Sequence, residues 1–179
     1  MMNAFQQTSS SISISKLYFH TFQSLVLCPI AAGQVVLGIV LAGAVRGSIF
    51  GGMIYLMAWL FFDGANLTGT GVAGMLLGSF CFSAMGAVVG FLVKQPDDTS
   101  LVNNFFIMPM TFFGGAFFPL QNLPEWLRPI ARLFPIGSMN LLLRGEYWTR
   151  DAISAAAILL GLSGIFFVWS IWLYSCYSE

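Results

Sequence analysis

Long apolar stretches, separated by short polar connectors, dominate the pattern of this sequence. Four of them reach the length of about 20 residues that a helix needs to cross the hydrocarbon core of a bilayer. None alternates between apolar and polar positions, as the strands of a membrane barrel do. We therefore predict an all-α membrane protein with about four transmembrane helices, at residues 35–62, 71–93, 101–120 and 152–175.

Two segments do not fit the pattern of a span. Residues 1–34 begin with a polar, serine-rich stretch, which we place outside the bilayer. Residues 121–150 combine three prolines, four arginines and two tryptophans. In this second segment we predict an interfacial helix that Pro135 breaks, then a short helix capped by Ser138. Together these helices form a re-entrant hairpin before the last span.

Composition places most of the chain in lipid. Of its residues, 58% are hydrophobic and 8% are charged, against about 25% charged in a soluble domain. Seven basic residues balance seven acidic ones and form no basic block, which excludes nucleic acid as a partner. The three cysteines lie far apart, with no neighbouring histidine, so we expect neither a disulfide framework nor a metal site.

Glycines recur at four-residue spacing in the first two predicted spans. Such stripes allow two helix backbones to approach closely in a membrane. The sequence leaves open whether the partner helix belongs to this chain or to another. The glycines expected at packing contacts are Gly43, Gly47, Gly51, Gly74, Gly78, Gly86 and Gly90.

Arg46 is the one charge deep in a predicted span. Two placements are open. Either it lies well inside the bilayer, where it must face protein or water, or the helix starts near Ala42 and Arg46 is interfacial.

The sequence contains no pattern typical of catalysis. The glycine-rich phosphate loop, the zinc-protease motif and the nucleophile elbow are all absent, and the seven acids lie in connectors or at chain ends. An enzyme embedded in the membrane would have to use Asn103, Asn104 and Arg46. We expect no enzyme activity, no cofactor bound by this chain, and energy supplied by another subunit.

Residues 113–145, FGGAFFPLQNLPEWLRPIARLFPIGSMNLLLRG, resemble the signature region of ABC-2 type transporter permeases. Phe134 departs from that pattern, since the family usually has asparagine before the proline. The matching residues are Phe118, Pro119, Leu120, Leu123, Pro124, Trp126, Leu127, Pro135, Arg144 and Gly145.

Residues 25–43, LVLCPIAAGQVVLGIVLAG, are similar to the cytoplasmic coupling segment of the same family. Ile39 stands where the family commonly has lysine or glutamate. The matching residues are Pro29, Ile30, Val36, Leu37, Gly38 and Leu41. The resemblance implies that the ATPase contacts are made by Leu27, Cys28, Pro29, Ile30 and Gln34.

This resemblance implies the membrane subunit of an ABC exporter for a drug-, lipid- or polysaccharide-like substrate. ATP would be hydrolysed by a separate ABC ATPase subunit, and a second permease copy, identical or different, would complete the assembly. The implied location is the cell (plasma or inner) membrane, or an organellar membrane of bacterial origin. The alternative is a permease-like subunit of a cofactor-maturation or assembly complex.

Members of that family usually have six spans, so this chain is expected to lack the first two and to leave its glycine stripes exposed. The resemblance places the N-terminus, the loop at Lys94 and the C-terminus in the cytoplasm, and residues 63–70 and the hairpin outside. Arginine placement favours the reverse orientation. We follow the resemblance, because acidic residues accompany the hairpin arginines.

Overall fold

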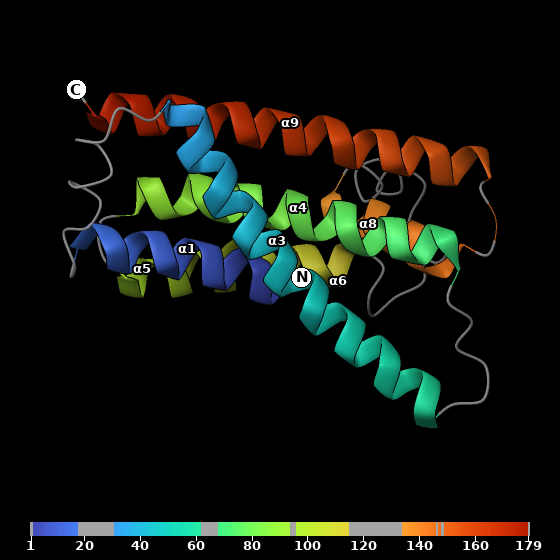
Figure 1. Ribbon diagram of the computed structural model, residues 1–179. Helices are drawn as coiled ribbons and strands as arrows, with labels where there is room; N and C mark the ends of the chain where they lie inside the picture. The colour runs from blue at the N-terminus through green and yellow to red at the C-terminus, as the bar shows by residue number, and fades with distance from the viewer. Residues whose placement is uncertain are drawn as a thin grey trace.

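The computed structural model of the protein describes residues 2–17, 31–61, 68–93, 96–114, 134–145, 147 and 149–178 (Figure 1). Helices account for nearly all of these residues and none of them forms a strand, which confirms the all-α prediction. The elements are α1 (Met2–Leu17), α3 (Ala32–Phe61), α4 (Gly69–Leu92), α5 (Pro96–Val102), the π-helix η1 (Asn103–Ile107), α6 (Met108–Phe113), α8 (Pro135–Arg144) and α9 (Arg150–Ser178).

Three of these helices are long and apolar enough to cross a membrane: Ala32–Phe61, Gly69–Leu92 and Arg150–Cys176. They coincide with the predicted spans at 35–62, 71–93 and 152–175. The third predicted span, 101–120, is helical up to Phe113 as part of a run through α5, η1 and α6. The last residues of this predicted span lie outside the described part of the chain. A fourth span therefore stays a prediction.

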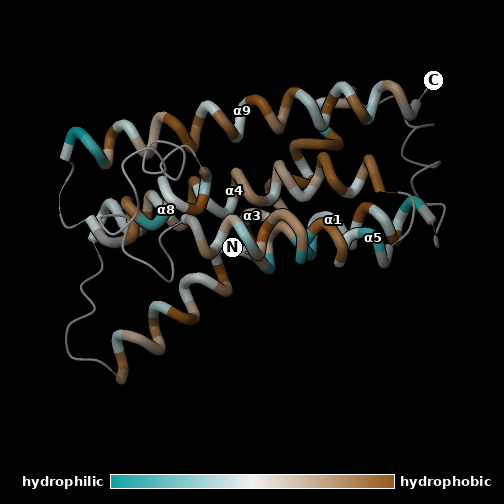
Figure 2. Tube along the Cα trace, turned by 180° about the vertical axis from the view of Figure 1, so that it is seen from behind, coloured by the Kyte–Doolittle hydropathy of each residue, from teal (hydrophilic) through white to brown (hydrophobic). Residues whose placement is uncertain are grey.

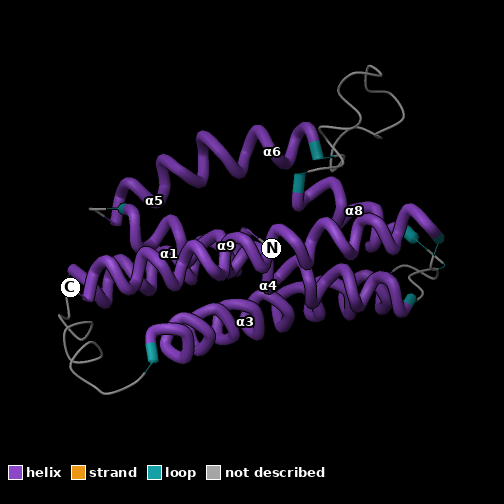
Figure 3. The backbone as a smooth tube through the Cα atoms, turned by 90° about the horizontal axis from the view of Figure 1, so that it is seen from above, coloured by secondary structure: helices purple, strands orange, loops and turns teal. Residues whose placement is uncertain are grey.

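Helix α4 is the centre of the bundle. In its most apolar stretch 61% of the residues are buried, against 28% in α3 and 22% in α9. Helices α1, α3, α8 and α9 all pack against it, and Figure 3 shows α3 on one side of the bundle and the α5–α6 run on the other. Most of the large exposed side chains of α3 and α9 are apolar, as lipid contact requires; Arg46 of α3 is an exception.

Helix α1 differs from the expectation for residues 1–34. Residues 2–17 form a helix inside the bundle, where we expected a polar segment outside the bilayer. Its buried residues recur in pairs four apart: Ala4 and Phe5, Thr8 and Ser9, Ile12 and Ser13. Small hydroxyl side chains allow close helix packing in membranes, because they can satisfy their hydrogen bonds on neighbouring helices. Mean hydropathy does not detect such a helix.

Contacts at the two ends of the bundle establish the relative directions of the helices. At one end, Lys16 donates from Nζ to the carbonyl of Phe91 over 3.2 Å, and Phe91 packs edge-on against Tyr174. At the other end, Thr70 donates to the carbonyl of Gly145. Helices α1, α4 and α9 therefore run parallel, while α3 runs antiparallel to them. The C-terminus and the start of α3 share one end, whereas the N-terminus lies near mid-length (Figure 1), not with them as expected.

Helix α8 begins earlier than predicted. Phe134 is its N-cap and Pro135 occupies the first turn, where the missing N–H of proline costs nothing. The prediction that Ser138 caps this helix is therefore wrong. Helix α8 packs against α4 and α9, and Asn140 donates from Nδ2 to the carbonyl of Gly114 over 2.8 Å. The second half of the predicted hairpin thus lies within the bundle, and the first half lies outside the described residues.

Candidate functional site

The glycine stripes are covered within this chain, largely by α1. Gly43 contacts Thr8 and Ser83, and a Cβ at Gly86 would lie 2.6 Å from the carbonyl oxygen of Phe5. Gly47 and Gly90 also contact α1. The expected exposure of these stripes is therefore wrong, since α1 fills the space beside them. The other three contact glycines pack elsewhere: Gly51 against Met75 of α4, Gly74 against Leu142 of α8, and Gly78 within the buried face of α4.

One hydrogen-bonded group joins three helices at this contact. The Ser83 hydroxyl donates to the carbonyl of Val40 on α3 over 2.8 Å. It also lies 3.0 Å from the hydroxyl of Thr8 on α1. A hydroxyl has one proton, and that of Ser83 goes to Val40, so Thr8 is the donor of the second bond. The chain of bonds fixes α1 in the groove between α3 and α4.

A second polar row follows the contact between α1 and α5. Ser9 donates to Thr99 at the long distance of 3.5 Å. The hydroxyl of Ser13 and the Oδ1 atom of Asn103 are buried without a hydrogen-bond partner in the described residues. Asn103 is the first residue of the π-helix η1, and single π-turns inside α-helices occur frequently at functional sites.

The outward side of α1 is mostly polar between its exposed apolar residues Met2 and Ile14, although the helices around it are apolar. Asn3, Gln6, Gln7 and Ser11 are exposed there. In Figure 2 most of the length of the long helices has apolar or intermediate colours. Hydrophilic colour gathers at the start of α9 and around α5. Amide side chains are costly in hydrocarbon. This side of α1, which we call the amide face (Asn3, Gln6, Gln7 and Ser11), therefore suits a water-filled route or a polar solute.

Arg46 lies beside the amide face. Helix α3 is continuous from Ala32 to Phe61, so the placement that starts the helix near Ala42 is excluded. Every 18-residue stretch within α3 contains Arg46, and therefore so does whichever part crosses the bilayer. Its side chain is exposed and makes no hydrogen bond or ion pair with any residue that the structure describes.

Helix geometry puts Arg46 and the amide face on the same flank. Ala4 packs on Gly47 and Thr8 on Gly43, so α1 and α3 are antiparallel. In two antiparallel right-handed helices, the residues that precede the contact residues project to the same side of the pair, since each residue turns the helix by about 100°. Arg46 precedes Gly47, while Asn3 and Gln7 precede Ala4 and Thr8.

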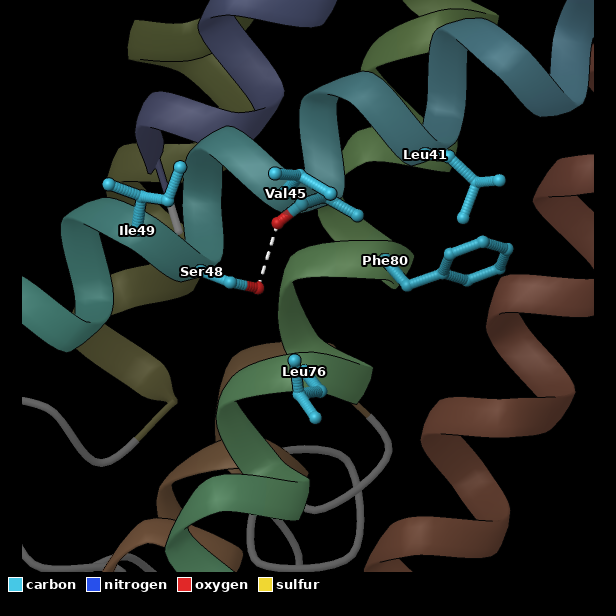
Figure 4. Close-up of a pocket in the computed structure, with 7 residues that line it drawn as sticks. Leu41, Val45, Ser48, Ile49, Leu76 and Phe80 are labelled. Carbon is cyan, nitrogen blue, oxygen red and sulfur yellow. Dashed lines mark hydrogen bonds between the residues drawn. The ribbon is translucent and has the colours of Figure 1, made fainter.

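A separate groove between α3 and α4 is apolar. It has a volume of about 460 Å³, and Figure 4 shows α9 running alongside it. Ser48 contributes its only hydroxyl, which donates to the carbonyl of Ala44 over 2.8 Å. A groove without free polar groups can hold an apolar chain but supplies no chemistry. It is lined by Leu41, Ala44, Val45, Ser48, Ile49, Leu76 and Phe80.

The other predicted site residues are only partly described. Gln34 lies exposed in the first turn of α3, and Pro135 and Gly145 begin and end α8. Arg144 is the last residue of α8. Among the described residues no group of His, Cys, Asp and Glu could hold a metal. The remaining predicted residues lie outside the described part: Leu27, Cys28, Pro29, Ile30, Phe118, Pro119, Leu123, Pro124, Trp126 and Leu127.

Sequence reasoning missed the amide face, because it assigned α1 to a segment outside the bilayer. The signal was present in the spacing of small residues. Ala4 and Thr8 are four apart, as are Phe5 and Ser9. This is the spacing of the glycines that they pack against, Gly47 and Gly43 for the first pair and Gly86 and Gly90 for the second.

Comparison with known proteins identifies the family. The model of the ABC-2 type transporter family matches residues 1–148, which is most of the chain. The chain belongs to the ABC-2 type transporter family. With its long apolar helices, it is an integral membrane protein.

Two relatives illustrate the extent of the match. The inner membrane transport permease YadH of Escherichia coli strain K12 is 29% identical over 135 residues, which cover 75% of this chain and 52% of that protein. Nodulation protein J of Sinorhizobium fredii is 26% identical over 126 residues, or 69% of this chain and 48% of its own length. The chain thus spans about half the length of these relatives. No solved structure matches it.

Proposed function

We propose that this chain is the permease part of an ABC exporter that moves a drug-, lipid- or polysaccharide-like molecule with ATP hydrolysed on a separate subunit. The observation that carries this proposal is the amide face of α1. A polar helix face held by a hydrogen-bonded contact inside an apolar bundle suits a route for a partly polar solute. Membership of the family supports the same function.

The ATPase is proposed to bind at the bundle end that holds Gln34 and Lys16. Gln34 is exposed there in the first turn of α3, next to the segment whose sequence resembles the family's coupling region. Because α3 carries Arg46 and contacts α1, a movement of its first turn would be passed directly to the amide face. A second copy of the permease, identical or different, would close the route on its open side.

Photo-crosslinking tests the position of the ATPase. The photo-reactive residue p-benzoylphenylalanine is placed at Gln34 in one variant and at Tyr147 in another, within the full-length protein in its native membrane. Both positions are exposed, and they lie at opposite ends of the bundle. We expect position 34 to capture a protein that binds a photo-reactive ATP analogue, and position 147 to capture none.

Two results would contradict the proposal in different ways. Capture of an ATP-binding protein at position 147 alone would place the ATPase at the wrong end of the bundle. Capture at neither position, with no ATPase in the purified complex, would reject the exporter function itself.

A further inference from the structure

We propose that Arg46, with the amides of Asn3 and Gln7, binds the anionic headgroup of an amphiphile beside helices α1 and α3. This inference rests on the proposed function and names the chemical class of the substrate as an apolar chain with a phosphate or carboxylate group.

The position of Arg46 is the first step. It lies in the middle of a 30-residue helix, inside every stretch that could cross the bilayer, and no described residue neutralises it. An arginine in a transmembrane segment is rare and almost always faces a partner, a cavity or a substrate pathway. A guanidinium has five donors in a planar fork that fits phosphate and carboxylate oxygens.

The amide face supplies the second step. Asn3 and Gln7 lie on the same flank as Arg46, and the antiparallel register places them on either side of its level: Ala4 opposes Gly47 and Thr8 opposes Gly43. Their amides donate hydrogen bonds without adding charge. An anion in front of Arg46 would therefore meet hydrogen-bond donors from two helices. An arginine alone would offer donors from only one helix.

The surface of α3 that follows Arg46 indicates where the apolar part of the ligand would lie. Phe50 and Met53 are exposed four and seven residues after Arg46, on the same face of α3. A ligand with its anionic group at Arg46 would thus lay an apolar chain along α3 toward Phe61.

Binding to the purified full-length permease in a neutral maltoside detergent tests the inference without any ATPase. The probe is radiolabelled dodecyl phosphate, and the competitors are inorganic phosphate, dodecyltrimethylammonium and dodecanol. We expect wild type to bind the probe and none of the three competitors to displace it at equal concentration. R46Q should weaken binding about tenfold or more, because a charged hydrogen-bond partner is lost. R46K, which keeps the charge but loses the planar fork, should bind more weakly than wild type and more tightly than R46Q.

The matched control is R150Q, which removes an exposed arginine at the start of α9, at the bundle end where Thr70 contacts Gly145. It should bind the probe like wild type. Equal binding by R46Q and wild type would overturn the inference, as would displacement by dodecanol or by inorganic phosphate at the same concentration as the unlabelled probe. An exporter that purifies with its ATPase but fails these tests would still satisfy the proposed function.

Discussion

Thr8 and Ser83 lie 75 positions apart in the sequence, yet their hydroxyl oxygens are 3.0 Å apart in the bundle. Ser83 also donates to the carbonyl of Val40. This group connects the polar helix α1 to two apolar spans, at the point where Gly43 allows the three backbones to meet. It explains how a serine-rich helix is held inside a membrane bundle.

Substitution of Ser83 should cost more stability than substitution of Thr8. Ser83→Ala removes both bonds of the group, whereas Thr8→Val keeps the bond to Val40 and the side-chain volume. Hydrogen bonds between membrane helices contribute about 0.6 kcal/mol on average, so we expect losses of about 1–2 and about 0.6 kcal/mol. The free energy of unfolding of each variant is measured in mixed detergent. Ser11→Ala, at an exposed position of α1, is the control, and a larger loss for Thr8→Val would contradict this hydrogen-bond assignment.

Gly86→Ala should destabilise the bundle, and Gly38→Ala should not. A Cβ at Gly86 would meet the backbone of Phe5, which cannot move aside as a flexible side chain can. Nothing lies within 4 Å of a Cβ at Gly38. Overpacking of this kind costs about 1–3 kcal/mol, while alanine in an open helical position is favoured over glycine by about 0.5–1 kcal/mol. Thermal unfolding of the two variants should therefore shift in opposite directions; equal shifts would show that α1 does not pack on α4 as described.

Cysteine at Gln7 should react with a water-borne methanethiosulfonate, and cysteine at Ile165 should not. Both side chains are exposed, but Gln7 belongs to the amide face, while Ile165 lies among the apolar residues of α9 that suit lipid contact. Thiolates, which form in water and not in hydrocarbon, are the reacting species. The labelling is done in membranes with the three native cysteines replaced by alanine. An unreactive position 7 would show that the amide face is covered from water.

Asn103→Leu should leave stability unchanged or raise it, while lowering substrate-stimulated ATP hydrolysis, because Asn103 begins the π-helix η1 and such turns occur frequently at functional sites. The Oδ1 atom of Asn103 is buried without a partner in the described residues, and a buried polar atom of this kind costs about 1–3 kcal/mol. The neighbouring exposed Asn104 provides the control variant Asn104→Leu. Thermal unfolding and substrate-stimulated ATP hydrolysis are the two measurements. A stability loss confined to Asn103→Leu would mean that Asn103 has a structural partner.

The long apolar helices and the glycine contacts could be predicted from sequence, because length and spacing alone decide them. Three predicted spans coincide with helices α3, α4 and α9. The glycines at 43, 47, 86 and 90 lie where helices touch. The coupling residues Leu27, Cys28, Pro29 and Ile30 and the first half of the hairpin stay predictions, since they lie outside the described residues.

By itself the sequence determined that lipid surrounds most of this chain and that its helices pack closely, since both follow from local composition and four-residue spacing. Only the tertiary structure decided which helices meet. The polarity of residues 2–17 argued for a surface segment, but Thr8 has its partner on α4, and α4 in turn donates to α3. The energy of a polar group in a membrane depends on such distant partners, and no local pattern encodes them. The same dependence sets the place of Arg46, which the continuity of α3 and the antiparallel register of α1 put beside Asn3 and Gln7.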